Sequence, residues 1–135
     1  MMIKINNQTS LMYIHFSTGI PNVLVQTSNE EISKFVAKAN RDQIIGYEVE
    51  NFEKHLNYIL TNLGLNSKQR LAVVLCYLRG KSEKTQKEFA QIFNISEGTY
   101  KNLERAEHNI NFDTFDIIVH QLPLEKRFLT KIFID

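Results

Sequence analysis

Apolar and polar positions alternate over most of the first 28 residues, a spacing typical of strands rather than helices. β-Forming residues fill 11–16 and 23–25, and the segment 18–22 between them contains Gly19 and Pro21. Glycine and proline are common where the chain turns. The pattern therefore predicts a β-hairpin with a loop over 18–22.

The next stretch changes to the spacing of an amphipathic helix. Ser28 is followed three residues later by Glu31, as in a capping box, and apolar residues recur at i, i+3, i+4 and i+7. We expect a helix over residues 29–40. Alternation returns over 45–49 and favours a short strand there, with the start of a helix as the alternative.

A second helical stripe leads to a boundary. The stripe runs from Asn51 to Leu63, and Gly64 follows where a left-handed residue commonly ends a helix. A new capping signal then opens at Asn66–Ser67. We therefore expect two domains, residues 1–66 and residues 67–135.

The second domain carries five consecutive helical patterns, each marked by apolar spacing and capping or breaking residues. The marks are the end of the first helix near Arg79–Gly80, the Thr85–Glu88 capping box of the second, Ser96 as cap of the third, the stripe 112–122 of the fourth and Pro123 opening the fifth. Inward positions include Ile92 and Phe112. The predicted fold class is α+β, with a small N-terminal β-hairpin/helix domain followed by an all-α five-helix domain.

Charge changes this picture only modestly. The chain has 135 residues and a net charge of +1, and 43% of its residues are hydrophobic. Residues 1–66 hold five Lys/Arg against six Asp/Glu, and residues 67–135 hold eleven against nine. From Arg70 to Arg105 the count is seven basic to four acidic. No apolar stretch approaches the roughly 18 residues of a membrane span, so we expect a cytoplasmic protein without membrane association.

The side chains that usually carry catalysis do not form a recognisable pattern. The four histidines are scattered without metal-ligand spacing, and the single cysteine, Cys76, sits in an apolar run where it is expected to be buried. There is no glycine-rich phosphate loop and no serine elbow. We expect no enzyme activity, no catalytic residues, no cofactor and no metal.

The most specific pattern lies in residues 85–105. It combines a polar start, an apolar–alanine pair, a turn, a hydroxyl cap and an acidic–basic finish: Thr85–Gln86, Phe89–Ala90, Asn94, Ser96 and Leu103-Glu104-Arg105. This resembles the helix-turn-helix of Cro/C1-type (Xre-like) transcriptional regulators, over about residues 67–122 with the flanking helices included. In that arrangement the second helix of the pair enters the DNA major groove.

The resemblance implies a set of DNA-binding residues around the two short helices. They are Thr85, Gln86, Lys87, Ser96, Glu97, Gly98, Thr99, Lys101 and Asn102. Asn102 is the first candidate for reading a base, because asparagine bonds adenine in bidentate fashion. Gln86 would contact a phosphate or a base, or else be an ordinary solvated side chain. Glu97 would read a base, repel wrong sequences, or only add favourable charge at a helix N-terminus.

The resemblance also implies a structural ion pair between Arg79 and Glu104, the alternative being two independent surface charges. Two departures from the family pattern stand out. Asn94 replaces the usual turn glycine but tolerates a positive φ. Ala106 replaces a glycine after the third helix and leaves the path of the loop over 107–111 open.

Two functions of different classes follow. The first is a repressor or autoregulator that binds palindromic double-stranded operator DNA as a homodimer, paired through the hairpin at 10–27 and the apolar run 128–134. The second is an antitoxin or phage-encoded inhibitor, whose N-terminal domain binds and blocks a protein while the helix-turn-helix autoregulates its operon. A helix-turn-helix reused for protein binding is a third alternative.

Overall fold

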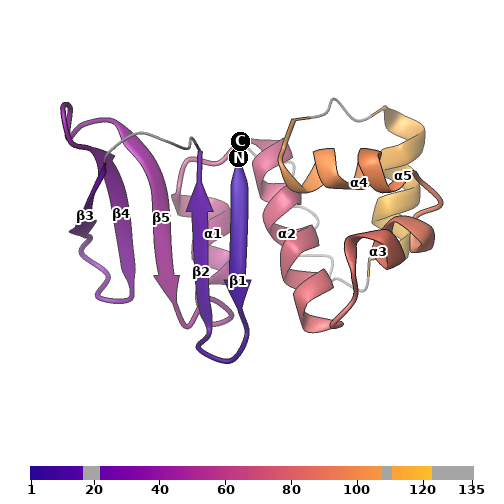
Figure 1. Ribbon diagram of the computed structural model, residues 1–135, viewed down its shortest axis with the longest axis horizontal. Helices are drawn as coiled ribbons and strands as arrows, with labels where there is room; N and C mark the ends of the chain where they lie inside the picture. The colour runs from indigo at the N-terminus through magenta and orange to yellow at the C-terminus, as the bar shows by residue number, and fades with distance from the viewer. Residues whose placement is uncertain (17–21, 108–110, 123–135) are drawn as a thin grey trace. The chain divides into compact units, whose positions relative to one another are not determined.

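The chain consists of two compact units, Met1–Leu56 and Asn57–Asp135, in a computed structural model (Figure 1). The residues that the structure describes are 1–16, 22–107 and 111–122. The division between the units falls before the boundary expected at Asn66–Ser67, because the residues of the helical stripe from Asn57 onward belong to the second unit.

The first unit is built on a five-stranded antiparallel sheet with the spatial order β1-β2-β5-β4-β3. Its strands are β1 (Met2–Asn6), β2 (Leu11–His15), β3 (Asn22–Gln26), β4 (Ile32–Ala37) and β5 (Ile44–Glu50). Strands β1 and β3 are the two edges. Strand β5, the last in sequence, lies between the two antiparallel pairs and joins them into one sheet.

This sheet corrects the predicted N-terminal fold. The expected hairpin of 11–16 with 23–25 does not form, because β2 pairs with β1 and β5 while β3 pairs with β4; most of the predicted loop lies outside the described residues. The expected helix over 29–40 is instead strand β4. Ile32 and Val36 are four residues apart, a spacing that puts them on one side of a helix and also on one face of a strand. Pairing with β3 and β5 decides for the strand and buries both.

The centre of the sheet is held by buried side chains that face one another across strands. Met12 lies opposite Val49, and Val49 lies opposite Ile32, with all three almost completely buried. Gly46 marks a place where two backbones come unusually close. A Cβ atom at Gly46 would lie 2.3 Å from the carbonyl oxygen of Ile14, so no other residue fits there without a shift of the strands.

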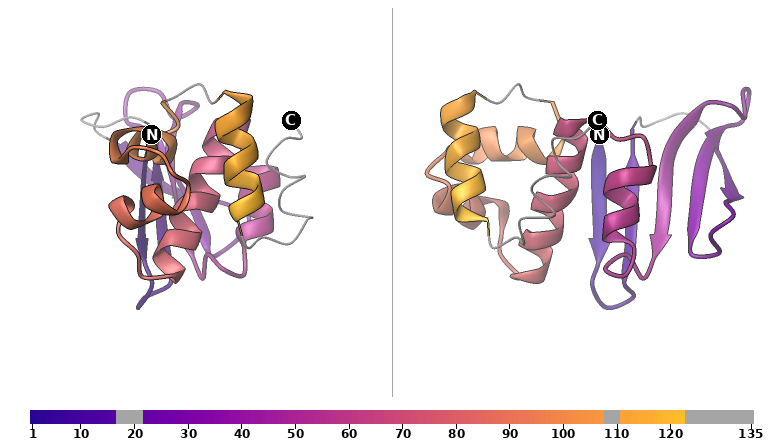
Figure 2. Two further views of the ribbon diagram at one scale, coloured as in Figure 1. Left: turned by 90° about the vertical axis from the view of Figure 1, so that its right-hand side faces the viewer. Right: turned by 180° about the vertical axis from the view of Figure 1, so that it is seen from behind.

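The regular secondary structure described in the second unit is all helical. The helices are α1 (Leu56–Asn62, whose first residue ends the first unit), α2 (Ser67–Lys81), α3 (Gln86–Ile92), α4 (Glu97–Glu104) and α5 (Phe112–Gln121); Figure 2 shows them from two further sides. Gly64, which follows the end of α1 after Leu63, has a φ of +69°, as its sequence position predicts. The predicted all-α five-helix domain is not what the structure shows: the described residues between 67 and 122 form four helices, and the fifth predicted helix lies outside the described part of the chain.

Local side-chain chemistry sets the helix ends. Four polar residues act as N-caps by accepting a hydrogen bond from a backbone N–H of the first turn: Asn66, Thr85, Ser96 and Asn111. Three helices end in a left-handed residue that is not glycine: Glu83 after α2, Asn94 after α3 and Ala106 after α4, with φ near 55°. In each case the following N–H bonds back to a carbonyl near the end of the helix, which closes it as a Schellman motif.

The core of the second unit differs in detail from the predicted stripes. Five consecutive residues of α2, Leu71 to Leu75, are buried, so α2 is covered around its circumference rather than on one face. Phe89 and Phe93 are buried, whereas the predicted inward residues Ile92 and Phe112 are 40% and 92% exposed. In α3 the inward side is completed by Ala90, so the buried face lies on the side away from Ile92. In the described part of the chain, no helix combines the length and apolar character needed to cross a bilayer.

Candidate nucleic-acid interface

The two short helices α3 and α4 are joined by a tight turn, and α4 packs against both α3 and α2. Only residues 93–96 separate α3 from α4. Asn94 takes the left-handed conformation, with a φ of 54°, and the N–H of Ile95 donates to the carbonyl of Ala90 over 3.0 Å. Cro/C1-type regulators, which this segment resembles, usually have glycine at this position of the turn. The turn nevertheless forms with Asn94, because asparagine tolerates a positive φ.

An aromatic cluster fixes how α4 sits on α3. The ring of Tyr100 lies 5.8 Å from that of Phe89 and 6.2 Å from that of Phe93, and the two phenylalanine rings are 5.4 Å apart. Tyr100 is fully buried, and burial together with the nearby charge of Glu104 raises the pKa of its hydroxyl. These rings place the opposite side of α4 outward.

Three of the predicted DNA-binding residues have a structural task. The hydroxyl of Thr85 accepts from the N–H of Glu88 at 3.1 Å and donates to the Glu88 carboxylate at 3.0 Å. The hydroxyl of Ser96 accepts from the N–H of Thr99 at 3.1 Å and donates to the Thr99 hydroxyl at 2.8 Å. These side chains start α3 and α4 at fixed positions, so any contact they make with DNA would be additional to this role.

The outward side of α4 brings together four of the predicted residues. Glu97 and Gly98 are exposed, and Lys101 and Asn102 are partly exposed. Glu97 and Lys101 form an ion pair at 3.4 Å with about four-tenths of each side chain exposed, so each neutralises part of the other's charge. Asn102 has no side-chain hydrogen bond in any described contact, which leaves its amide available.

Gln86 makes a side-chain contact within the protein that the family resemblance does not imply. Its amide Nε2 donates to Oε1 of Glu104 at 3.0 Å, so the side chain links the start of α3 to the end of α4. The neighbouring Lys87 is exposed. The Gln86 side chain therefore helps to hold α3 and α4 together, whereas Lys87 faces solvent at the start of α3.

Glu104 is the residue through which α2, α3 and α4 are connected by side-chain hydrogen bonds. Arg79 holds it in a two-pronged contact, with Nε to Oε2 at 2.6 Å and Nη2 to Oε1 at 3.0 Å. These are the two residues for which the family resemblance implies an ion pair. Burial alone would raise the pKa of Glu104, but the hydrogen bonds that it accepts, first of all from Arg79, outweigh this and hold the pKa below its ordinary value. The pair ties the end of α4 to the end of α2.

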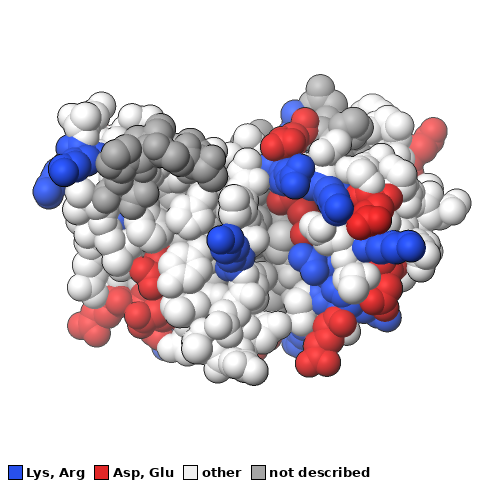
Figure 3. Space-filling view, in the orientation of Figure 1, with Lys and Arg blue, Asp and Glu red and all other residues white. Residues whose placement is uncertain are grey.

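The basic surface is smaller than the sequence count indicates. Arg70 is 4% exposed and donates to the carbonyl of Leu65 and to the hydroxyl of Ser67 at 3.1 Å. Its guanidinium group therefore adds little positive charge to the protein surface. The charge of Arg79 is neutralised by its ion pair with Glu104. Figure 3 shows Lys and Arg side chains intermingled with Asp and Glu over the helices rather than gathered in one field. Any DNA affinity from charge alone is therefore modest.

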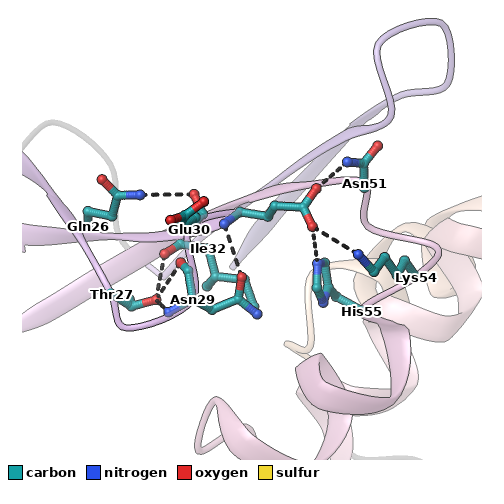
Figure 4. Close-up of polar contacts among 9 residues, drawn as sticks. Gln26, Thr27, Asn29, Glu30, Ile32, Asn51, Lys54 and His55 are labelled. Carbon is teal, nitrogen blue, oxygen red and sulfur yellow. Dashed lines mark hydrogen bonds and ion pairs between the residues drawn. The ribbon is translucent and has the colours of Figure 1, made fainter.

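A second polar cluster lies in the first unit, centred on Glu31 (Figure 4). Its carboxylate accepts from the Asn51 amide and lies 3.0 Å from His55 Nε2 and 3.4 Å from Lys54 Nζ. The hydrogen bonds from Asn51 and His55 lower the pKa of Glu31 to about 2. The sequence suggested Glu31 as a helix-capping residue; the structure instead makes it a link between the start of β4 and the turn after β5.

The described geometry defines a class of site: a helix, a short turn and a second helix, packed together by aromatic rings and tied to a longer helix by an ion pair. No protein-family model, curated protein or solved structure matches the chain. Among the described residues, no group of three His, Cys, Asp or Glu side chains is arranged to hold a metal ion. Sequence reasoning missed the Gln86–Glu104 bond and the burial of Arg70, and no local pattern signals either of them.

Proposed function

We propose that this chain is a sequence-specific double-stranded DNA-binding transcriptional regulator, acting as a repressor or autoregulator, with α4 as its recognition helix. The observation that carries the proposal is the outward face of α4. There Gly98 and Asn102 are presented on a helix whose other side is locked by Tyr100 and by the Arg79–Glu104 pair. A rigid short helix with polar residues on its open side is what a major-groove reader requires.

The dimensions suit this role. The eight residues of α4 make a helix about 12 Å long, comparable with the width of the major groove. In the groove, Nδ2 of Asn102 would donate to N7 of an adenine, and Oδ1 of Asn102 would accept from the N6 amino group of the same base. The Lys101 side chain would leave its ion pair with Glu97 and contact a DNA phosphate instead. Gly98 would let the backbone approach the DNA closely, since it adds no side chain.

Asn102→Ala tests base reading. We expect a loss of about 1–3 kcal/mol on the preferred site and relaxed preference at one base pair. The matched control is Gln91→Ala, which removes an exposed amide from α3 instead of α4. The measurement is fluorescence anisotropy with DNA from upstream of the gene and with a scrambled duplex. Equal losses on both duplexes would make Asn102 a phosphate contact rather than a reader.

Gly98→Ala separates DNA binding from folding. A Cβ at Gly98 meets no atom within 4 Å, and alanine is a better helix former by roughly 0.5–1 kcal/mol, so the variant should be as stable as the wild type or more so. If α4 lies in the groove, the added methyl group should nevertheless weaken DNA binding. A wild-type protein that binds no duplex even at low salt would refute the proposed function, because low salt favours any basic DNA-binding surface.

A further inference from the structure

Strand β3 ends the sheet with one side open. Among the described residues no strand pairs with its outer side, and Leu24 at its centre is 49% exposed. The N–H of Thr27 donates to the carbonyl of Ile32 at 3.2 Å, which sets the alternation of bonded and non-bonded pairs along β3 and β4. By that alternation Val25 bonds toward β4, and the N–H and C=O of Leu24 point to the open side. An open edge of this kind is a template for another strand.

We propose that β3 pairs antiparallel with β3 of a second copy of this chain, with Leu24 opposite Leu24 on the twofold axis. The strand reads Asn-Val-Leu-Val-Gln, which has nearly the same chemistry in both directions. Antiparallel pairing centred on Leu24 sets Val23 opposite Val25 on each side. A twofold interface requires such self-complementarity, because the same residues face one another across the axis.

Charge selects β3 over the other edge. Strand β1 is centred on Lys4, and the same pairing there would set Lys4 opposite Lys4. Like charges directly opposite each other destabilise a strand pair, and a lysine in an edge strand is a common protection against pairing. No residue of β3 is charged and none is proline, so this edge lacks that protection.

A row of residues that crosses the sheet would continue through the new contact. The register places Met2, His15, Gly46, Phe35 and Leu24 side by side on successive strands. Because Gly46 has no side chain, the rings of His15 and Phe35 approach to 5.2 Å across β5. A second copy would extend this row from Leu24 to Leu24 and remove the exposed leucine from water.

The inference deepens the proposed function and rests on it in part, because one short recognition helix reads too few base pairs and palindromic operators are read by dimers. It gives the first unit the task of pairing two copies, while α4 reads DNA. The two ideas can fail separately, since self-association and DNA binding are measured independently.

The test uses the full chain and sedimentation velocity. The wild type should be a dimer, and Leu24→Lys should shift it to monomer at the same concentration. Met2→Lys is the matched control: it places the same charge on an exposed residue of the other edge strand and should leave the dimer intact. Mixing Leu24→Lys with Leu24→Glu should restore a dimer, because only this register sets the lysine opposite the glutamate. Circular dichroism checks that each variant is folded.

Amide hydrogen exchange provides a test that needs no substitution. The Leu24 amide should be protected at high protein concentration and lose protection on dilution, whereas the Lys4 amide should show no such dependence. A monomeric wild type, an unchanged dimer in Leu24→Lys, or concentration-independent exchange at Leu24 would overturn the proposal. Dimerisation through β3 without any DNA binding would instead refute the proposed function and leave this inference standing.

Discussion

The charge on Glu104 decides how firmly α4 is held, and its removal has a calculable cost. The carboxylate is only 6% exposed and accepts three hydrogen bonds, two from Arg79 and one from Gln86. Breaking a fully buried ion pair costs about 3–5 kcal/mol. The Arg79 side chain is 27% exposed, so water solvates part of the guanidinium that Glu104→Gln leaves behind. We therefore expect this substitution to lower the free energy of unfolding by about 2 kcal/mol.

Removing the other partner of the ion pair should lower the free energy of unfolding further. Arg79→Met leaves the carboxylate of Glu104 charged and nearly without water, so we expect a loss of about 3 kcal/mol. The double variant should lose less than the sum of the two single losses, because each single variant already removes the shared contact. Urea unfolding followed by circular dichroism measures all three. Additive losses, or a loss below about 0.5 kcal/mol for Arg79→Met, would refute the reasoning.

The pair also predicts a pH dependence. The pKa of Glu104 lies below its ordinary value in the folded state, so its contribution to stability is present above the ordinary value of 4.5 and is lost as the pH falls through the lower folded value. Glu104→Gln should flatten that part of the stability curve. If α4 reads DNA as proposed, the same variant should weaken binding similarly for all sequences, because it loosens α4 without changing the side chains on its outward face.

Three further outcomes are expected. Ala106→Gly should raise the free energy of unfolding by about 0.5–1 kcal/mol, since Ala106 holds a φ of 57° that glycine adopts without strain; no gain in urea unfolding would contradict this. Gly46→Ala should cost about 1–3 kcal/mol in the same assay, because its Cβ would press on the carbonyl of Ile14; an unchanged midpoint would count against it. Glu31→Gln should remove stability that the wild type shows above pH 4.5 and loses toward about pH 2, and parallel acid-unfolding curves for the two proteins would disprove a stabilising role of the Glu31 carboxylate, which contacts Asn51 and His55.

Much of the second unit was visible in the sequence because its signals are local. The Thr85–Glu88 capping box spans three residues, and Ser96 starts α4 by bonding a backbone N–H within the next turn. Gly64 and Asn94 occupy left-handed positions beside the helices that they end. Interactions of this kind involve neighbours along the chain, so they hold whatever the rest of the protein does.

The first unit shows where local patterns lose their meaning. Ile32 and Val36 satisfy a helix and a strand equally well, and only pairing with β3 and β5 selected the strand. That pairing depends on β5, the last strand along the chain, inserting between β2 and β4, an order that no short stretch of sequence specifies. The same holds for the bond from Gln86 to Glu104, eighteen residues apart. In the second unit the sequence by itself determined where α2, α3 and α4 begin. The tertiary structure decided the strand order, the strand at Ile32–Ala37 and the contacts of Arg79 and Gln86 with Glu104, because these depend on residues far apart in sequence whose interaction energies exceed local preferences.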